Sequence, residues 1–451
     1  MYNSVDWMKQ ARAVDRVLSK APLINKNLRV PTDEFKRRQK SVYDELQKAG
    51  FDIGIVYSDE HYNGDVPYLG GNTNISIEPV AGVIGKTGFH ILAGLEGGYI
   101  AEQLGPRSGS KIHKVEILKL ADEEYPVKAE RIEDVMAECA GKKIEKIALL
   151  TSRAVFPVSI LEMLANYLGG TDKIVDMQET YYKIKYEKSD IEMLLTRDCS
   201  LIADVMLEGM LAVLKPGMYE TQVAQWGYNI ALELGAEELG FDIMVTSGES
   251  NRSLIGKALN REIQDGDVVH IGVAPKRDGL TACERVSVVA VDDPSKVSAR
   301  QKFWLNFVGE AFSIGLEKYR EVARNGSPAK LQEQALIDYF KSRSNDVFKL
   351  TGKHIDMENQ KPYTGTHNGG YTECQEFYGA ITLNSEEPLG NQIITMLDVA
   401  VRGIGNVWND IVIPGVDYYV VEKTLGKHGK DVDVFNNLPI DVQQYVGKAY
   451  Q

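Results

Sequence analysis

Histidine and carboxylate side chains in the second half of the chain have the types and spacing needed for acid–base chemistry. His270 and Glu284 lie in GDVVHIGVAPKRDGLTACERVSV, which predicts a strand that contains Gly272, a turn and a second strand. His367 lies in GTHNGG, where glycines let a ligand come close to the backbone. Because an imidazole donates and accepts protons near neutral pH, His367 is the first candidate for proton transfer.

Three other polar residues are candidates for the same site. Asp398 lies in the apolar string IITMLDVAV, where an unpaired carboxylate would be costly, so it should face a partner or a pocket. Arg402 follows shortly after it and has the chemistry to bind a substrate carboxylate, with a surface ion pair as the alternative. Glu373 in YTECQEF follows GTHNGG and could line a pocket beside it.

The cysteines indicate no covalent or metal-bound framework. Cys139, Cys199, Cys283 and Cys374 are scattered without C-x-x-C spacing, so neither disulfides nor a structural zinc site is expected, and a reducing compartment suits them. Cys283 and Cys374 could supply a nucleophile or a Cys-His metal site. Free cysteines are more often small buried residues.

The elements that must position these residues begin with a mixed pattern up to about residue 180. Helical spacing of apolar residues in PTDEFKRRQKSVYDELQKAG gives way to a short apolar run in FDIGIVYSDEHY. The runs PVAGVIGK, GFHILAG, GGYIAEQL, HKVEILK and EKIALLTS are expected to be strands, and AERIEDVMAECA and PVSILEMLANYLG are expected to be helices. The pattern predicts an α/β domain that ends near residues 175–185.

The remainder of the chain alternates helix pairs with strands. Two helical stretches are broken at Pro216 and Gly217, because proline lacks an N–H and glycine favours a turn, and Ser189 is suited to cap the first stretch. A second pair, ARQKFWLNFVGEAFSIGLEKYREVARN and SPAKLQEQALIDYFKSR, meets at Gly326. This order predicts an α+β domain with internal pseudo-repetition.

The composition is that of a folded protein with an acidic surface. The 451 residues are enough for two domains, and 43% of them are hydrophobic. The 64 Asp and Glu outnumber the 51 Lys and Arg, and the net charge of −13 disfavours nucleic-acid phosphates and anionic lipids. The first residues lack a signal-peptide core, and no stretch approaches the ~18 apolar residues of a membrane span. We expect a cytoplasmic protein that binds neither nucleic acid nor membranes.

The chain resembles the creatinase, aminopeptidase P and prolidase superfamily, whose catalytic domain has the pita-bread fold. The matching strings are YYKIKYEKSDIEMLL, LKPGMYETQVAQ, FDIMVTSGES, REIQDGDVV and GTHNGG, and GFDIGIVYSDEHYNGDVPYLGG is similar to the smaller domain that precedes it. The resemblance implies an α+β fold in which residues 1–180 form a creatinase-like N-terminal α/β domain with an N-terminal extension. Residues 181–451 then form the pita-bread domain. It also implies a homodimer.

The resemblance does not carry over the metal site of the peptidase members, which hold two divalent ions with two Asp, one His and two Glu. The first aspartate position falls on Gly272, and the second falls on Ala282 or Cys283. A thiolate could bind a soft metal, but neither residue replaces a carboxylate. The histidine position falls on His367 and is retained.

The other positions of the peptidase machinery are also altered. The first glutamate falls near Leu397 or Asp398, and the last falls on Asn409 in VWNDIVI. The histidine that positions substrate falls on Ile255 or Gly256. Because two divalent ions repel each other unless several carboxylates neutralise them, a dinuclear peptidase site is not expected.

Creatinase members cleave a C–N bond without metal and hold a cationic guanidinium-type group with carboxylates. LTACERVSV is similar to the creatinase string that carries one of these acids, which implies Glu284 as a substrate-binding acid. The alternative is an ion pair between Glu284 and a neighbouring Arg or Lys. For His367 the alternative is a buried histidine bonded to a backbone carbonyl. His270 should point to the face of the missing aspartate, or it is a core histidine.

Three functions are compatible with these residues. The leading one is a metal-independent, cofactor-free, creatinase-like hydrolase that cleaves a C–N or related bond in a small nitrogen-containing carboxylate, with His367 and Glu284 catalytic. The side chains expected to contact its substrate are Asp398, Glu373, His270 and Arg402. The second is an inactive pita-bread protein that binds a peptide or protein. The third is a metal enzyme with a rearranged mononuclear site, whose candidate ligands are His270, His367 and Asp398, with Glu284 or Glu373 as an optional further ligand.

Overall fold

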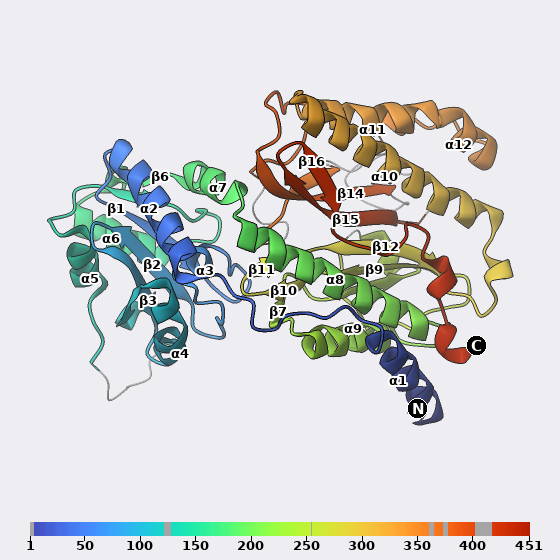
Figure 1. Ribbon diagram of the computed structural model, residues 1–451, viewed down its shortest axis with the longest axis horizontal. Helices are drawn as coiled ribbons and strands as arrows, with labels where there is room; N and C mark the ends of the chain where they lie inside the picture. The colour runs from blue at the N-terminus through green and yellow to red at the C-terminus, as the bar shows by residue number, and fades with distance from the viewer. Residues whose placement is uncertain (1–3, 121–127, 254, 360–364, 373–377, 402–416) are drawn as a thin grey trace. The chain divides into compact units, whose positions relative to one another are not determined.

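The chain folds into two compact units, each with its own sheet (Figure 1). The computed structural model describes residues 4–120, 128–253, 255–359, 365–372, 378–401 and 417–451. The smaller unit comprises Leu28–Glu192, and the larger unit combines Met1–Asn27 with Met193–Gln451.

The smaller unit is built on one mixed sheet. Among its described residues the strands run in the order β4-β3-β2-β1-β5-β6. Their bounds are β1 Ile53–Ser58, β2 Val80–Gly85, β3 Gly88–Ala93, β4 Lys111–Lys114, β5 Ile147–Leu149 and β6 Ile174–Asp176. The central strand β2 is antiparallel to both of its neighbours, whereas the outer pairs β3–β4, β1–β5 and β5–β6 are parallel.

Helices pack against both faces of this sheet. They are α2 Thr32–Lys48, α3 Asp65–Gly70, α4 Gly97–Leu104, α5 Ile132–Ala140, α6 Val158–Leu168 and α7 Gln178–Tyr186. Ile53 and Ile55 of β1 share an apolar cluster with α5 and α6. A side chain on Gly54, which faces the other way, would meet Leu46 of α2. Alternate residues of one strand therefore serve two apolar layers.

One segment that the sequence predicts to be a strand is helical. GGYIAEQL forms α4, so the prediction of a strand is wrong there. Oε2 of Glu78 accepts hydrogen bonds from the backbone N–H groups of Glu96 (3.1 Å) and Gly97 (2.5 Å) at the start of this helix. A carboxylate at this position satisfies donors that the helix leaves unpaired and interacts favourably with the helix dipole.

The larger unit has a main sheet in the order β13-β14-β15-β12-β9-β8, with β16 also paired to β15, counted over its described residues. Its strands are β8 Met244–Ser247, β9 Val268–Val273, β12 Glu284–Val289, β13 Thr366–Asn368, β14 Gln392–Val401, β15 Tyr419–His428 and β16 Asp431–Val434. Neighbouring strands are antiparallel throughout. A small separate sheet contains β7 Glu238–Leu239, β10 Pro275–Arg277 and β11 Leu280–Thr281.

Two helix pairs cover one face of the main sheet (Figure 1). The helices of this unit are α1 Ser4–Leu18, α8 Asp190–Val213, α9 Glu220–Leu234, α10 Ala299–Asn325, α11 Lys330–Ser342 and α12 Ser344–Thr351. Ile271 and Val286 pack with α8 and α9, and Val421 and Val399 pack with α10 and α11. These four residues follow one another across β9, β12, β15 and β14 in register, so they share a face.

The predicted helix breaks are confirmed. The gap between α8 and α9 contains Pro216 and Gly217, and Gly326 ends α10 with a φ of +62°. The hydroxyl and the backbone N–H of Ser189 both donate to Oε2 of Glu192 at the start of α8. The side chain of Ser189 thus takes part in the cap of the predicted helix.

The N-terminal helix α1 belongs to the larger unit. The ring of Trp7 lies 5.7 Å from that of Trp226 in α9, and Nε1 of Trp226 donates to Oε1 of Gln10 (2.9 Å). From the sequence, the extension was expected to belong with residues up to 180, whereas the structure divides the chain after Asn27 and after Glu192. The domain boundary at residue 180 stays a prediction.

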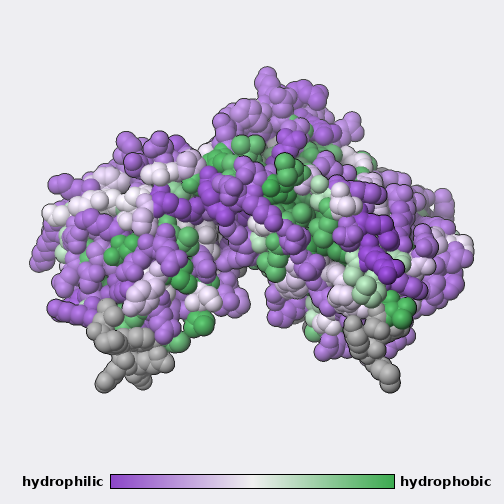
Figure 2. Space-filling view, turned by 60° about the horizontal axis from the view of Figure 1, so that its bottom comes forward, coloured by the Kyte–Doolittle hydropathy of each residue, from purple (hydrophilic) through white to green (hydrophobic). Residues whose placement is uncertain are grey.

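Hydrophilic side chains, in purple, predominate on the face seen in Figure 2, and hydrophobic ones gather in smaller green patches. This distribution agrees with the acidic, charge-rich composition. None of the helices in the described ranges combines the length and the apolar character that a bilayer crossing requires.

Candidate active site

Neighbouring strands align polar side chains on the face of the main sheet opposite the helix pairs. Gly272 of β9 lies directly across from Arg285 of β12, which lies across from Glu422 of β15. Glu422 in turn lies across from Asp398 of β14. Residues directly opposite each other share a face, and side chains alternate along a strand, so His270 belongs to the same face.

His367 joins this group from β13. It lies across from Met396 of β14, which precedes Asp398 by two residues and therefore points to the same side of the sheet. The structure thus brings together His270, His367 and Asp398, three of the residues predicted for the site. It adds two that the sequence analysis does not name, Arg285 and Glu422.

Arg285 is the centre of the group and is only 8% exposed. Its Nε donates to Nε2 of His270 (3.1 Å), and its Nη2 donates to the hydroxyl of Tyr418. Its Nη1 donates to Oδ2 of Asp398 (2.9 Å) and to Oε2 of Glu422 (3.2 Å). The guanidinium is therefore surrounded by acceptors on neighbouring strands, the arrangement that makes a buried arginine tolerable.

The contacts fix the charge states of His270 and Arg285. Burial, followed by the positive charge of Arg285, lowers the pKa of His270 well below its ordinary value, so this imidazole is neutral. Its Nε2 accepts from Arg285, which leaves the proton on Nδ1, 3.3 Å from Oγ1 of Thr246. Burial alone would lower the pKa of Arg285, but Asp398, Tyr418 and Glu422 raise it well above its ordinary value.

His367 and Glu422 form an imidazole–carboxylate pair. Nε2 of His367 lies 3.4 Å from Oε1 of Glu422, and Nδ1 lies 3.1 Å from the backbone oxygen of Asn368. Burial alone would raise the pKa of Glu422, but the hydrogen bond from His367 and the charge of Arg285 hold it below its ordinary value. With Nδ1 donating to the carbonyl, Nε2 is the nitrogen that exchanges a proton beside an ionised carboxylate.

Glu284 lies on the opposite, helix-covered face. It precedes Val286 by two residues and so points away from Arg285. Nζ of Lys423 donates to Oε1 of Glu284 (2.6 Å), and both side chains are buried. Burial raises the pKa of Glu284 to about 8, Lys423 opposes this shift and Asp204 adds to it. The contact with a neighbouring Lys that the sequence left open as the alternative is therefore present, as a hydrogen bond to an acid whose ionisation burial opposes.

The remaining predicted candidates do not enlarge the group. Glu373 and Arg402 lie outside the described residues, as do Cys374 and Asn409. Cys283 is fully buried in a small apolar cluster with residues of β14, and its backbone N–H donates to the hydroxyl of Thr424 (3.0 Å).

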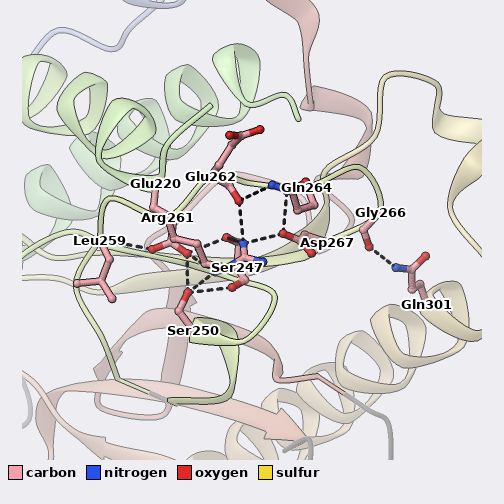
Figure 3. A network of polar contacts seen from close by, with 10 residues as sticks. All are labelled: Glu220, Ser247, Ser250, Leu259, Arg261, Glu262, Gln264, Gly266, Asp267 and Gln301. Carbon is pink, nitrogen blue, oxygen red and sulfur yellow. Dashed lines mark hydrogen bonds and ion pairs between the residues drawn. The ribbon is translucent and has the colours of Figure 1, made fainter. Parts of the chain in front are cut away.

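A polar network holds the loop that leads into β9 (Figure 3). Glu220, the first residue of α9, accepts from the backbone N–H and hydroxyl of Ser247 (both 2.7 Å) and from the hydroxyl of Ser250 (2.5 Å). Nη1 of Arg261 bridges Oγ of Ser247 (2.6 Å) and Oδ2 of Asp267 (2.7 Å). These charge-assisted bonds tie the two ends of the loop together.

The same loop reaches the site through Asn251. Its Oδ1 accepts from the backbone N–H of Tyr418 (2.7 Å), whose hydroxyl contacts Arg285. Ile255, one of two positions assigned to the substrate-positioning histidine, lies in this loop and is 73% exposed. The loop therefore positions Tyr418 and, through it, Arg285.

The residues present do not fit a dinuclear divalent site. With Arg285 in place, the described ranges contain no group of three or more His, Cys, Asp or Glu arranged to hold a metal ion. Both carboxylates of the group already receive hydrogen bonds from Arg285. Gly272 at the first aspartate position, and Ala282 or Cys283 at the second, offer no oxygen ligand from their side chains.

Arg285 and Glu422 are the residues that sequence reasoning missed. Arg285 follows Glu284 directly in LTACERVSV. Because side chains alternate along a strand, this pattern predicts that one of the two residues faces the site and the other faces the helices. Glu422 lies in YVVEKTLGKH, a string with strand propensity that contains a single acid. Glu422 lies beside His367, whereas Asn409, the position given to the last glutamate ligand, lies outside the described residues.

Comparison with known proteins finds sequence similarity to peptidases. The model of metallopeptidase family M24 matches residues 195–376. An uncharacterized peptidase of Bacillus subtilis, YqhT, is 29% identical over 124 residues, which are 27% of this chain and 35% of that protein. The match therefore spans only about a third of that relative's length.

Solved structures match over nearly the whole chain. The X-Pro aminopeptidase of Thermotoga maritima superposes with a TM-score of 0.68 at 16% identity, over 90% of this chain and 98% of that one. The dipeptidase PepE of Mycobacterium ulcerans gives 0.67 at 17% identity, over 92% and 98%. Together with the match to the family M24 model, these structures confirm the predicted resemblance to the creatinase, aminopeptidase P and prolidase superfamily. The predicted α+β pita-bread fold with a preceding N-terminal domain is confirmed with it.

Proposed function

We propose that the protein is a metal-independent hydrolase that cleaves a C–N or related bond in a small nitrogen-containing carboxylate. The observation that carries this proposal is the chain of contacts His367–Glu422–Arg285–Asp398 on one face of the sheet. The hydrolase class is supported by the match to metallopeptidase family M24 and by the aminopeptidase and dipeptidase names of the structural relatives.

His367 is the proposed proton-transfer residue. In the form that lacks the proton on Nε2, and with it the hydrogen bond to Glu422, this nitrogen takes a proton from the attacking water while the water oxygen bonds to the scissile carbon. Glu422, 3.4 Å away, stabilises the imidazolium that results. The same proton then passes to the departing nitrogen as the C–N bond breaks. The hydrogen bond from Nδ1 to the carbonyl of Asn368 keeps the ring oriented for both transfers.

Asp398 is the proposed partner of the cationic end of the substrate. Its side chain is 15% exposed, compared with 1% for Glu422, so it is the more accessible of the two carboxylates. Arg285 keeps it in position by a hydrogen bond to Oδ2. Two further expectations from the sequence stay predictions. One is that the protein is a homodimer, and the other is that Arg402 binds a substrate carboxylate.

Turnover of a defined compound set tests this proposal. Protein purified in the presence of a chelator would be incubated with guanidino, N-methyl and betaine-type amino acids and with Xaa-Pro dipeptides, and released amine would be followed by NMR. We expect turnover by the wild type, a loss of about 100-fold or more in kcat for Glu422→Gln and His367→Ala, and a smaller change for the control Glu284→Gln. Turnover that requires added metal would contradict the proposal.

The saturated contacts of Arg285 favour a second candidate, a binding protein without turnover. Both carboxylates of the group are engaged by an internal guanidinium, as expected for a rigid recognition surface. A compound from the same set that raises the melting temperature of wild type, and that is recovered unchanged after long incubation, would favour this candidate over the hydrolase.

A further inference from the structure

The guanidinium of Arg285 lies among the positions that the resemblance assigns to metal ligands. Gly272, at the first aspartate position, is directly across from Arg285 in the β9–β12 pair. Asp398, beside the first glutamate position, is 2.9 Å from Nη1. His367, the retained histidine, reaches the same group through Glu422. An internal organic cation therefore lies in the space that the ligand positions surround.

The absence of a side chain at Gly272 is linked to Arg285. A Cβ atom at Gly272 would lie 3.0 Å from Cγ of Arg285 and 3.3 Å from Sδ of Met244. Contacts this short force the neighbours to move, so any side chain at this position competes with the stem of the arginine. The missing aspartate and the buried arginine are thus two parts of one rearrangement.

The atoms around the guanidinium are the kinds that bind transition-metal ions. Nε2 of His270 carries its lone pair toward Arg285, and Oδ2 of Asp398 and Oε2 of Glu422 are carboxylate oxygens. Neutral imidazole nitrogen and carboxylate oxygen are ordinary ligands of Zn²⁺ and Mn²⁺. While Arg285 is present, its charge repels a divalent ion over a few ångströms of poorly screened space.

We propose that Arg285 is a built-in cation that takes the place of divalent metal ions, and that removal of its side chain opens a site for one divalent cation at His270, Asp398 and Glu422. The guanidinium of Arg285 is thus the cation that holds His270, Asp398 and Glu422 together. This proposal goes beyond the proposed function, because it holds whether or not the protein turns over a substrate.

Metal rescue of Arg285→Ala tests the proposal. Loss of a buried guanidinium leaves two carboxylates without their counter-charge, so the melting temperature of this variant should fall by roughly 10 °C. Titration with Mn²⁺ or Zn²⁺ should restore at least about half of that loss, because the ion binds only the folded state. Metal analysis after removal of excess ion should find stoichiometric metal in the variant and only traces in wild type.

Arg277→Ala is the matched control. Arg277 is also fully buried and pairs with a carboxylate, Asp198, at 2.5 Å, but it lies outside the site. This variant should be destabilised and should not respond to either metal. Metal rescue of both variants to the same extent would overturn the proposal, as would stoichiometric metal in wild type. An Arg285→Ala variant that folds with wild-type stability and binds no metal would also overturn it.

Arg285→Lys covers the case in which the alanine variant does not fold. Lysine keeps a positive charge near Asp398 and Glu422 but lacks the planar fork of donors. We expect a folded, moderately destabilised and metal-free protein. Stoichiometric metal in the lysine variant would overturn the proposal, since a cation would then bind although the side chain at position 285 still carries a positive charge.

Discussion

Two buried glutamates on adjacent strands have opposite electrostatic settings. His367 and Arg285 hold the pKa of Glu422 below its ordinary value against the effect of burial. Burial raises the pKa of Glu284 to about 8, although Lys423 lies 2.6 Å away. Glu422 is therefore suited to stabilise a nearby imidazolium, whereas Glu284 is a group whose ionisation opposes folding.

Replacing Glu284 by Gln should make the free energy of unfolding less dependent on pH. The pKa of Glu284 is raised in the folded state, so its protonated form contributes stability that is fully present below the unfolded-state value of about 4.3. This stability is lost as the pH rises through about 8. Glutamine cannot ionise and keeps an oxygen to accept from Lys423.

Urea unfolding between about pH 5 and pH 9 measures this difference. Wild type should lose stability with rising pH more steeply than Glu284→Gln, and the variant should be the more stable of the two at the alkaline end. Glu284→Asp, which can still ionise, serves as the control. Equal pH slopes for wild type and the glutamine variant would show that Glu284 is already ionised across this range.

At the scale of elements, the antiparallel pair β9–β12 couples Gly272 to Arg285. Gly272→Ala should destabilise the protein by about 1–2 kcal/mol, because the new Cβ would lie 3.0 Å from Cγ of Arg285. In an Arg285→Ala background that contact is gone, so the cost of the same substitution should fall by about half or more. Denaturant unfolding of the four proteins in this double-mutant cycle gives the coupling directly.

Additive effects in this cycle would contradict the coupling. Gly369 offers a comparison, because a Cβ there would meet Met396 at 2.5 Å and none of the three atoms nearest to it belongs to Arg285. Gly369→Ala should destabilise both backgrounds to the same extent.

Strand alternation and helix breaks made much of this architecture predictable from the sequence. The glycine context of His367 and the apolar string around Asp398 made each residue a candidate, and the pairing of β13 with β14 puts them on one face. For Glu284 and its neighbour Arg285, the period of two puts the side chains on different faces of the strand but does not determine which face carries the site. The predicted strand at GGYIAEQL is a helix for a reason that also lies outside the local pattern. The carboxylate that caps this helix belongs to Glu78, which is not part of the segment.

The contacts of Arg285 with β15 and β14 could not be predicted in the same way. Glu422 is 137 positions away in sequence and Asp398 is 113 positions away, and their approach depends on cross-strand register. Register is set by the packing of the whole sheet on its helices, which no local pattern contains. A comparison of motifs therefore could not identify Arg285 as the central cation of the site.

At the scale of the whole molecule, the larger unit is discontinuous in sequence because α1 packs on α9. Deletion of residues 1–27 should lower its stability by about 3 kcal/mol, since Ala13 and Val14 leave the apolar core and Trp226 loses its partners Trp7 and Gln10. Calorimetry of the shortened and full-length chains measures the change. Trp7→Ala, with a partly exposed side chain, is the milder comparison and should lower stability less.

An unchanged melting temperature of the larger unit after this deletion would show that α1 contributes no stability to it. The contacts of Ala13, Val14, Trp7 and Gln10 named above lie in the larger unit, so the smaller unit should unfold as it does in the full-length chain. A shift confined to the smaller unit would contradict the assignment of residues 1–27 to the larger one.

The central claim is that an arginine, and not a pair of metal ions, is the cation of this site. The most direct measurement is elemental analysis of wild type purified without added metal, together with its melting temperature before and after chelation. The structure predicts substoichiometric metal and an unchanged melting temperature, because Arg285 already balances Asp398 and Glu422. Stoichiometric divalent metal whose removal lowers the melting temperature would contradict the claim.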